Sequence, residues 1–190
     1  MKTTRRDVMA LAVAATATSL SAGAGIAGGV AAPWRKLRRV VTTDGPDGRG
    51  LVLADGSPGN SFVMNGTKIT RLWESASVPA PLPATEDLGK TAGNAYREGF
   101  RGTSFYIAEL PPGTDETDIP MHRQDTLDYM AVLSGQVVLR IEGQDIPLEA
   151  GDTIVQSGNL HTWINRGTEP CVLLFVVIAG ERQAGATPAS

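Results

Sequence analysis

The second half of the chain is a series of short apolar runs separated by turn residues, and this feature most restricts the folds open to it. The runs that fit strands are Thr103–Leu110, Leu127–Leu133, Gln136–Ile141, Ile146–Leu148, Thr153–Val155, His161–Asn165 and Cys171–Ile178. Glycine or proline follows most of them, for example at Pro111, Gly135 and Gly143. Closely spaced short strands indicate an all-β sandwich or barrel, and no stretch shows the period of a long helix.

Two further pairs of runs precede this series and predict two β-hairpins. These pairs are Arg39–Thr43 with Gly50–Ala54 and Ser61–Met64 with Lys68–Trp73. The dipeptide Asn65-Gly66, between the runs of the second pair, is typical of a two-residue hairpin turn. We expect these strands either to extend the sheets of the barrel or to pair across a homodimer.

The chain has two histidines, His122 and His161, and both lie in this second half. Side chains two positions apart on a strand share a face. His122 is therefore expected to project with Gln124, and His161 with Trp163 and Asn165. Two imidazoles and a carboxylate from separate strands can hold a divalent metal ion at one open face, so the sequence contains residues for a metal site.

The carboxylate best placed to join the histidines is Asp128, which lies inside an apolar run. Asp128 shares its face with Met130 and Val132, so the site would be a small polar cluster in an apolar pocket. We predict that Met130, Val132 and Trp163 form the walls and contact the substrate, although Trp163 fits a plain core position equally well. Asp128 is either a metal ligand or, if it is not a ligand, a catalytic general base.

The segments around the histidines resemble the two paired motifs of the cupin superfamily. In the first motif, His122, Asp128 and Gly135 stand at the positions of the first His, the Glu and the closing Gly. Gln124 stands where the second His of that motif belongs. The second motif is the closer match, with Gly151, Gly158, His161 and Asn165 in place and Gln156 in the position of its Pro.

This resemblance covers roughly residues 101 to 180 and implies a cupin-like double-stranded β-helix, or jelly-roll, barrel with an N-terminal β-hairpin extension. It also implies a divalent metal ion (Fe, Zn, Mn or Ni) held by His122, Gln124, Asp128 and His161. Two roles stay open for Gln124, a neutral oxygen ligand or a hydrogen-bond partner that orients His122.

The same resemblance leaves the reaction open, because cupins include dioxygenases, isomerases, lyases, decarboxylases and cyclases. We expect a metal-dependent enzyme of lyase, isomerase or oxygenase type that acts on a small organic substrate inside the barrel. A Lewis-acid role needs only a bound cation and an open coordination position. The alternative is a non-catalytic cupin that binds a small ligand.

Composition supports a small-molecule partner rather than a nucleic acid. The chain has 17 Lys and Arg against 20 Asp and Glu, a formal net charge of −3, and no basic patch. Aromatic residues make up 5% of the chain, too few for the stacking platforms that bind single strands. The sequence has no Gly-rich phosphate loop and no serine nucleophile elbow.

The N-terminus has the features of a targeting segment. Thr4-Arg5-Arg6-Asp7 precedes an uncharged stretch from Val8 to Trp34 that is rich in Ala, Gly, Ser and Thr. This arrangement resembles a twin-arginine export signal, so we expect an exported protein, periplasmic or secreted, with no membrane insertion after cleavage. The alternative is a transmembrane anchor, which the length would allow. The single cysteine, Cys171, excludes an intramolecular disulfide and is most simply a small buried residue.

We therefore divide the chain into four parts. Residues 1–32 are the expected signal peptide, residues 33–100 the β extension with a Pro/Gly-rich loop, residues 101–180 the cupin barrel and residues 181–190 a C-terminal tail. Within the extension, residues 77–101 fit either a lid over the mouth of the barrel or a mobile connector.

Overall fold

The computed structural model describes residues 36–90 and 99–185 of the chain. Its strands are β1 (Arg39–Asp44), β2 (Gly50–Gly56), β3 (Ser61–Met64), β4 (Thr67–Ser75), β5 (Thr103–Leu110), β6 (Thr126–Ser134), β7 (Gln136–Ile141), β8 (Gln144–Glu149), β9 (Thr153–Ser157), β10 (His161–Ile164) and β11 (Cys171–Ala179). Among these residues the single helical element is a 3-10 turn, η1 (Leu88–Lys90). The all-β prediction is confirmed. No helix in the described ranges is long and apolar enough to cross a membrane.

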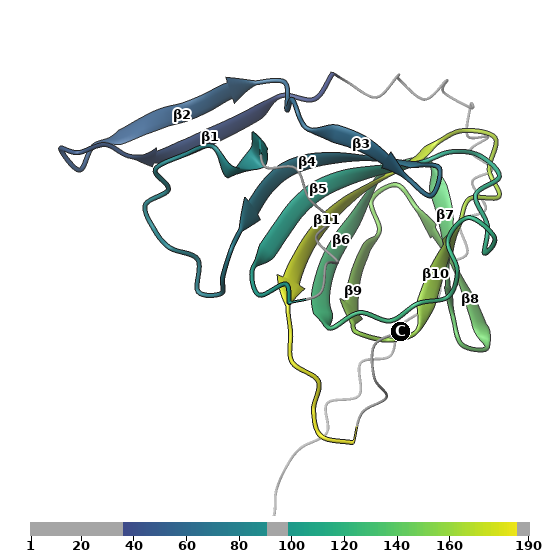
Figure 1. Ribbon diagram of the computed structural model, residues 1–190. Coiled ribbons are helices and arrows are strands. Elements are labelled where there is room, and N and C mark those ends of the chain that lie inside the picture. The colour runs from purple at the N-terminus through teal and green to yellow at the C-terminus, as the bar shows by residue number, and fades with distance from the viewer. Residues whose placement is uncertain (1–35, 91–98, 186–190) are drawn as a thin grey trace, which may run out of the picture. The chain divides into compact units, whose positions relative to one another are not determined.

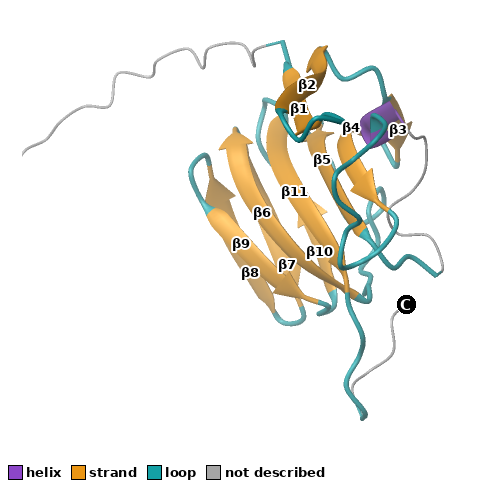
Figure 2. Ribbon diagram, turned by 90° about the vertical axis from the view of Figure 1, so that its left-hand side faces the viewer, coloured by secondary structure: helices purple, strands orange, loops and turns teal. Residues whose placement is uncertain are grey.

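The barrel is built from two antiparallel sheets that face each other. The larger sheet has six strands in the order β3-β4-β5-β11-β6-β9, and the smaller has three in the order β10-β7-β8. Figure 1 shows the larger sheet curving around an interior that β7, β8 and β10 close on the other side. The quarter-turned view in Figure 2 shows the strands running nearly side by side. Because several adjacent strands are distant in sequence, the topology brings the two histidine segments together.

The predicted hairpins form, and one of them extends the barrel sheet. Between β3 and β4, Asn65 and Gly66 have φ of 50° and 75°, as a type I′ turn requires. Strand β4 pairs with β5 along its length, so this hairpin continues the six-stranded sheet. Strands β1 and β2 pair only with each other and form a separate two-stranded ribbon, which Figure 1 shows reaching away from the barrel. The predicted signal segment and residues 91–98 of the predicted lid lie outside the described residues.

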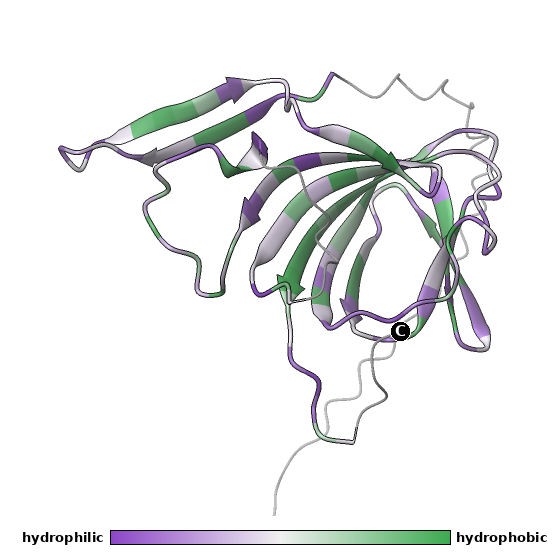
Figure 3. Cartoon of the chain, viewed as in Figure 1, coloured by the Kyte–Doolittle hydropathy of each residue, from purple (hydrophilic) through white to green (hydrophobic). Residues whose placement is uncertain are grey.

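The core fills the space between the two sheets. Alternate residues of β5, β6 and β11 face inward, and Leu173 and Val177 are fully buried. Three aromatic rings link the sheets: Tyr106 stacks on Phe175 with centroids 4.8 Å apart, and Trp163 meets Phe175 edge-on at 6.1 Å. Figure 3 shows apolar residues along these barrel strands, most clearly on β11. This packing holds the strands on which the candidate site is mounted.

Candidate functional site

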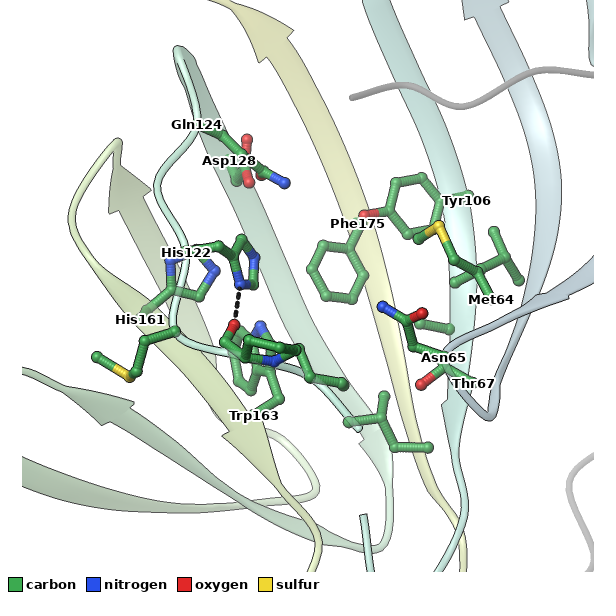
Figure 4. A pocket seen from close by; sticks show the side chains of 16 residues that line it. Met64, Asn65, Thr67, Tyr106, His122, Gln124, Asp128, His161, Trp163 and Phe175 are labelled. Carbon is green, nitrogen blue, oxygen red and sulfur yellow. Dashed lines mark hydrogen bonds between the residues drawn. The ribbon is translucent and has the colours of Figure 1, made fainter. Parts of the chain in front are cut away.

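His122 and His161 are joined through their main chains. The amide of His122 donates to the carbonyl oxygen of His161 at 2.9 Å, and the amide of His161 donates back at 3.0 Å. A residue pair that exchanges both hydrogen bonds directs both side chains to the same face. The two imidazoles accordingly lie together, with ring centroids 4.3 Å apart and planes inclined by 52° (Figure 4).

Main-chain carbonyls also fix which ring nitrogen of each histidine is free. Nδ1 of His122 lies 2.8 Å from the oxygen of Pro120, and Nδ1 of His161 lies 3.0 Å from the oxygen of Asn159. A carbonyl only accepts, so each neutral imidazole carries its proton on Nδ1 and keeps a lone pair on Nε2. Burial lowers the pKa of His161 to about 4, which keeps this imidazole neutral near pH 7. Such a tautomer is the one that a metal-ligating histidine uses through Nε2.

The two imidazoles line a cavity of about 490 Å³ inside the barrel. Its walls are mostly apolar and aromatic, and its lining residues are Met64, Asn65, Thr67, Ile69, Tyr106, Ala108, Leu110, Ile119, Pro120, Met121, His122, Gln124, Asp128, His161, Trp163 and Phe175. Figure 4 shows the histidines on one side of this space and Tyr106, Met64 and Asn65 on the other. A mostly apolar cavity of this size with a few convergent polar groups is typical of a small-molecule site.

Asp128 lies on β6 at the wall of the same cavity, and its side chain is buried, with 3% of the residue exposed. Burial raises the pKa of Asp128 to about 6, while a hydrogen bond with Thr126 partly opposes the shift. Its Oδ1 atom has no hydrogen-bond partner. A carboxyl group that titrates near pH 6 inside a cavity can both take up and release a proton under mild conditions.

The predicted metal residues meet around one cavity without forming a complete cluster. His122, Gln124, Asp128 and His161 all line it. Within residues 36–90 and 99–185, however, no three His, Cys, Asp or Glu side chains come close enough to hold a metal ion together. The structure thus brings the two imidazoles into a pair, with Asp128 elsewhere on the same wall.

Of the three residues predicted to contact the substrate, Trp163 lines the cavity, whereas Met130 and Val132 do not. Trp163 lines it and meets the ring of His161 edge-on at 6.2 Å. Met130 and Val132 share the inward face of β6 with Asp128 but lie buried in the core, away from the cavity lining. Tyr106 and Phe175 also line the cavity, and neither was predicted from the sequence. The inward alternation of Thr103–Leu110 and Cys171–Ile178 was the signal that could have identified them.

Asn165, which shares the motif of His161, has a structural role. Its side-chain amide donates to the carbonyl oxygens of Leu110 and Glu169, both at 3.0 Å, and its Oδ1 accepts from the amide of Gly167 at 2.9 Å. The residue is fully buried. Asn165 therefore ties the end of β10 to β5 and does not face the cavity.

Arg182, beyond the last strand, ties together the two loops that carry the histidines. Its Nη2 donates to the carbonyl oxygen of Gln124 at 2.9 Å and to that of Gly158 at 3.1 Å, and its guanidinium pairs with Asp125. A Cβ atom at Gly158 would lie 2.9 Å from the oxygen of Gln124, and the φ of 64° also favours glycine. This role of Arg182 was not predicted, because an arginine near the C-terminus carries no local sequence signal.

Cys171 and Arg140 lie outside the site, and Cys171 is the small buried residue that the sequence predicts. Cys171 is fully buried, and burial raises the pKa of its thiol to about 11, so it is no nucleophile. Arg140 is on the outer side of β7 and forms ion pairs with Glu116 and Asp145. Those carboxylates raise the pKa of the guanidinium further.

Comparison with protein families bears on the identity of this barrel. Residues 106–177 match the family described as "Cupin domain". This match supports a cupin domain in that part of the chain. The match contains all four residues predicted to surround the metal, and the barrel has the double-stranded β-helix architecture expected of cupins.

Among curated proteins, this chain is similar to "Phomopsin biosynthesis cluster protein C'" and "Phomopsin biosynthesis cluster protein D" from Diaporthe leptostromiformis. Each is 36% identical over 66 residues, which are 34% of this chain and 33% of the relative. The chain thus matches only about a third of the length of these relatives.

Solved structures similar to this one include the Cupin_2 domain of an XRE family transcriptional regulator from Enterobacter cloacae. That structure has a TM-score of 0.39 and 12% identity, covering 61% of this chain and 99% of its own. A predicted oxalate decarboxylase from Thermotoga maritima has a TM-score of 0.40 and 24% identity, covering 63% of this chain and 90% of its own.

Proposed function

We propose that this protein is an enzyme that uses a divalent cation, held by His122 and His161, to act on a small organic molecule inside the barrel. The observation that carries the proposal is the pair of imidazoles, each fixed through Nδ1 by a main-chain carbonyl and each facing the same cavity. A histidine whose second nitrogen is held in this way is oriented for ligation through Nε2.

The two imidazole nitrogens suit one divalent transition-metal ion. His122 and His161, whose ring centroids are 4.3 Å apart, would hold the ion through their Nε2 atoms. Gln124, two residues after His122 and on the same cavity wall, supplies a neutral oxygen for a third position. Imidazole nitrogen suits Zn, Fe and Ni better than Mg or Ca.

A cation bound there would act as a Lewis acid toward a carbonyl or hydroxyl oxygen of the substrate. The residues of the chain supply the rest of the chemistry. Asp128, with its pKa near 6, takes a proton from the substrate and returns it, because neither charge state is strongly favoured near that pH. Trp163, Tyr106 and Phe175 exclude water from the cavity and orient the molecule against the histidines. Proton transfer next to a polarised oxygen serves lyase and isomerase reactions.

We also propose that the protein is exported and that residues 1–32 are its signal. The support is the pair Arg5-Arg6 before a mild apolar stretch in the sequence. The twin-arginine route carries folded proteins. A cupin that acquires its metal ion in the cytoplasm would keep it during export by this route.

A second candidate is a non-catalytic cupin that captures a small ligand. The mostly apolar lining, with Ile69, Leu110 and Phe175, favours this alternative, since apolar contacts alone can hold a ligand. Turnover separates the two candidates, because a binding protein releases its ligand unchanged.

Elemental analysis of protein purified without a His tag tests the proposal. We expect about one equivalent of a first-row transition metal in the wild-type protein and a large loss of it in His161→Ala. Asn159→Ala is a suitable control, because its main-chain carbonyl still holds His161 and its side chain donates to the carbonyl oxygen of Leu160. A wild-type protein that remains metal-free after incubation with Zn, Fe, Mn and Ni would contradict the proposal.

A further inference from the structure

The hairpin of β3 and β4 supplies the wall of the cavity that faces the histidines. Its turn residue Asn65 lines the cavity together with Met64 and Thr67. Figure 4 shows the Asn65 amide pointing into this space, with His122 and His161 on the opposite side. A molecule inside the barrel therefore has the histidine pair at one end and the Asn65 amide at the other.

The turn accounts for an asparagine at position 65 but leaves its side chain available. Asn65 and Gly66 have φ of 50° and 75°, a conformation that Asn, Asp and Gly all tolerate. No hydrogen bond joins the side chain of Asn65 to another described residue. Because Asn65 is exposed at the rim of the cavity, a ligand in the cavity can reach its amide.

The cavity between these two ends is mostly apolar and aromatic. Figure 4 shows the ring of Phe175 between the histidines and Asn65. Tyr106 stacks on Phe175 with ring planes only 7° apart, and both residues line the cavity. Facing sheets lie about 10 Å apart, so one six-membered ring with a polar group at each end spans the space from β10 to the hairpin. Flat aromatic walls suit such a ring.

The charges of the lining restrict the polar group at the Asn65 end. No lysine or arginine is among the described residues that line the cavity, and Asp128 is the one carboxylate among them. A carboxylate or phosphate placed beside Asn65 would lose water without gaining a cationic side chain. An uncharged carbonyl oxygen loses less on leaving water, and it accepts a hydrogen bond from the amide N–H of Asn65.

We propose that Asn65 determines specificity by donating a hydrogen bond to a carbonyl oxygen at one end of an uncharged, mostly apolar ring compound. The opposite end of this compound carries a hydroxyl group and reaches His122 and His161. The inference rests on the proposed function for this second contact, in which the hydroxyl oxygen would bind the cation. Without a cation, the hydroxyl group would donate to a free Nε2. The inference adds a recognition residue and a substrate class to the histidine pair.

The test compares two phenols in the wild-type protein and in Asn65→Gly. 4-Hydroxyacetophenone carries a carbonyl group opposite its hydroxyl group, whereas 4-ethylphenol has nearly the same shape and lacks the carbonyl oxygen. Glycine tolerates the positive φ, so the substitution keeps the turn and removes the side chain. In calorimetric titrations with a chelator present, the affinity ratio of the ketone to 4-ethylphenol should fall about fivefold from wild type to Asn65→Gly.

Two further variants identify the amide as the cause. Asn65→Asp keeps the turn and replaces the N–H donor by a carboxylate, so the affinity ratio should fall at least as far as in Asn65→Gly. Glu142→Gly places a glycine in the exposed turn between β7 and β8, away from the cavity lining, and should keep the wild-type ratio. An unchanged ratio in Asn65→Gly, or an equal fall in Glu142→Gly, would overturn the role of Asn65.

A third probe, 4-hydroxybenzoate, checks the ligand class. It places a carboxylate where 4-hydroxyacetophenone has its ketone. At pH 7 it should bind the wild-type protein more weakly than the ketone does, because the described lining offers a carboxylate, Asp128, and no lysine or arginine. Tighter binding of 4-hydroxybenzoate would overturn the uncharged class in favour of an anion.

Zinc titration of Asn65→Gly separates this inference from the proposed function. The variant should bind zinc as the wild type does, because Asn65 lies across the cavity from the histidines. A lower affinity ratio with zinc binding intact supports the role of Asn65. An affinity ratio that depends on Asn65 in a protein that takes up no metal would refute the metal-dependent function and leave the role of Asn65 standing.

Discussion

The main chains of His122 and His161 exchange two hydrogen bonds, of 2.9 and 3.0 Å, and this isolated bridge places the two imidazoles side by side. The residues are far apart in sequence and belong to different motifs. Their rings are held by local backbone pairing, while Pro120 and Asn159 fix the ring nitrogens. The candidate metal site is therefore preorganised by the backbone before any ion binds.

Asp128 should make the stability of the protein depend on pH. Its pKa is raised from 3.8 to about 6 by burial, so the folded state binds more protons than the unfolded state between these values. The stabilisation is fully present below pH 3.8 and is lost as the pH rises through 6. Relative to Asp128→Asn, the wild-type protein should lose about 2 kcal/mol of unfolding free energy between pH 4 and pH 7. Urea denaturation of both proteins with a chelator present measures this difference, and parallel pH profiles would refute it.

Gln124→His should strengthen metal binding. The substitution places a third imidazole on the cavity wall two residues from His122, and imidazole is a stronger ligand for Zn, Fe and Ni than an amide oxygen. We expect zinc affinity to rise at least tenfold in a competition titration with a chelating dye. Gln144→His, on an exposed strand position, controls for a histidine added elsewhere. Equal affinities for wild type and Gln124→His would place Gln124 outside the ligand set.

Arg182→Gln should loosen the two histidine loops. The guanidinium donates to the carbonyls of Gln124 and Gly158, and its loss leaves both loops without their common tether. We expect a loss of about 1–2 kcal/mol of stability and faster hydrogen exchange at the amides of His122 and His161. Arg166→Gln, which removes an exposed ion pair with Asp145, should change neither exchange rate. Unchanged exchange in Arg182→Gln would show that the loops hold their positions without it.

The sequence was sufficient for the strands and insufficient for the details of the site. Thr103–Leu110 and Gln136–Ile141 are strands with the predicted bounds, because alternating apolar residues and the following turn residues are local signals. Asp128 was predicted to face the cavity for the same reason. The cavity walls depend on how the sheet curves, which no local pattern encodes, so Tyr106 and Phe175 were missed while Met130 and Val132 fell in the core. The tether from Arg182 is equally non-local.

Replacement of both Arg5 and Arg6 by Lys tests export. The change keeps the charge, so a purely electrostatic role at a membrane surface would survive, whereas a receptor that reads the arginine pair would not accept it. We expect the double variant to stay in the cytoplasm, uncleaved and folded. Cell fractionation with N-terminal mass measurement gives the result. Normal export of the variant, or a mature protein that keeps Met1, would contradict the signal peptide.

The most direct test of the account is a zinc-binding cycle on His122→Ala, His161→Ala and the double variant. If both imidazoles hold one cation, each single substitution should lower zinc affinity at least a hundredfold, and the double variant should bind little more weakly than either single variant. Circular dichroism confirms that all variants keep their β-sheet signal. Affinities that remain near wild type in either single variant, or losses that simply add in the double variant, would show that the two histidines do not share a metal ion.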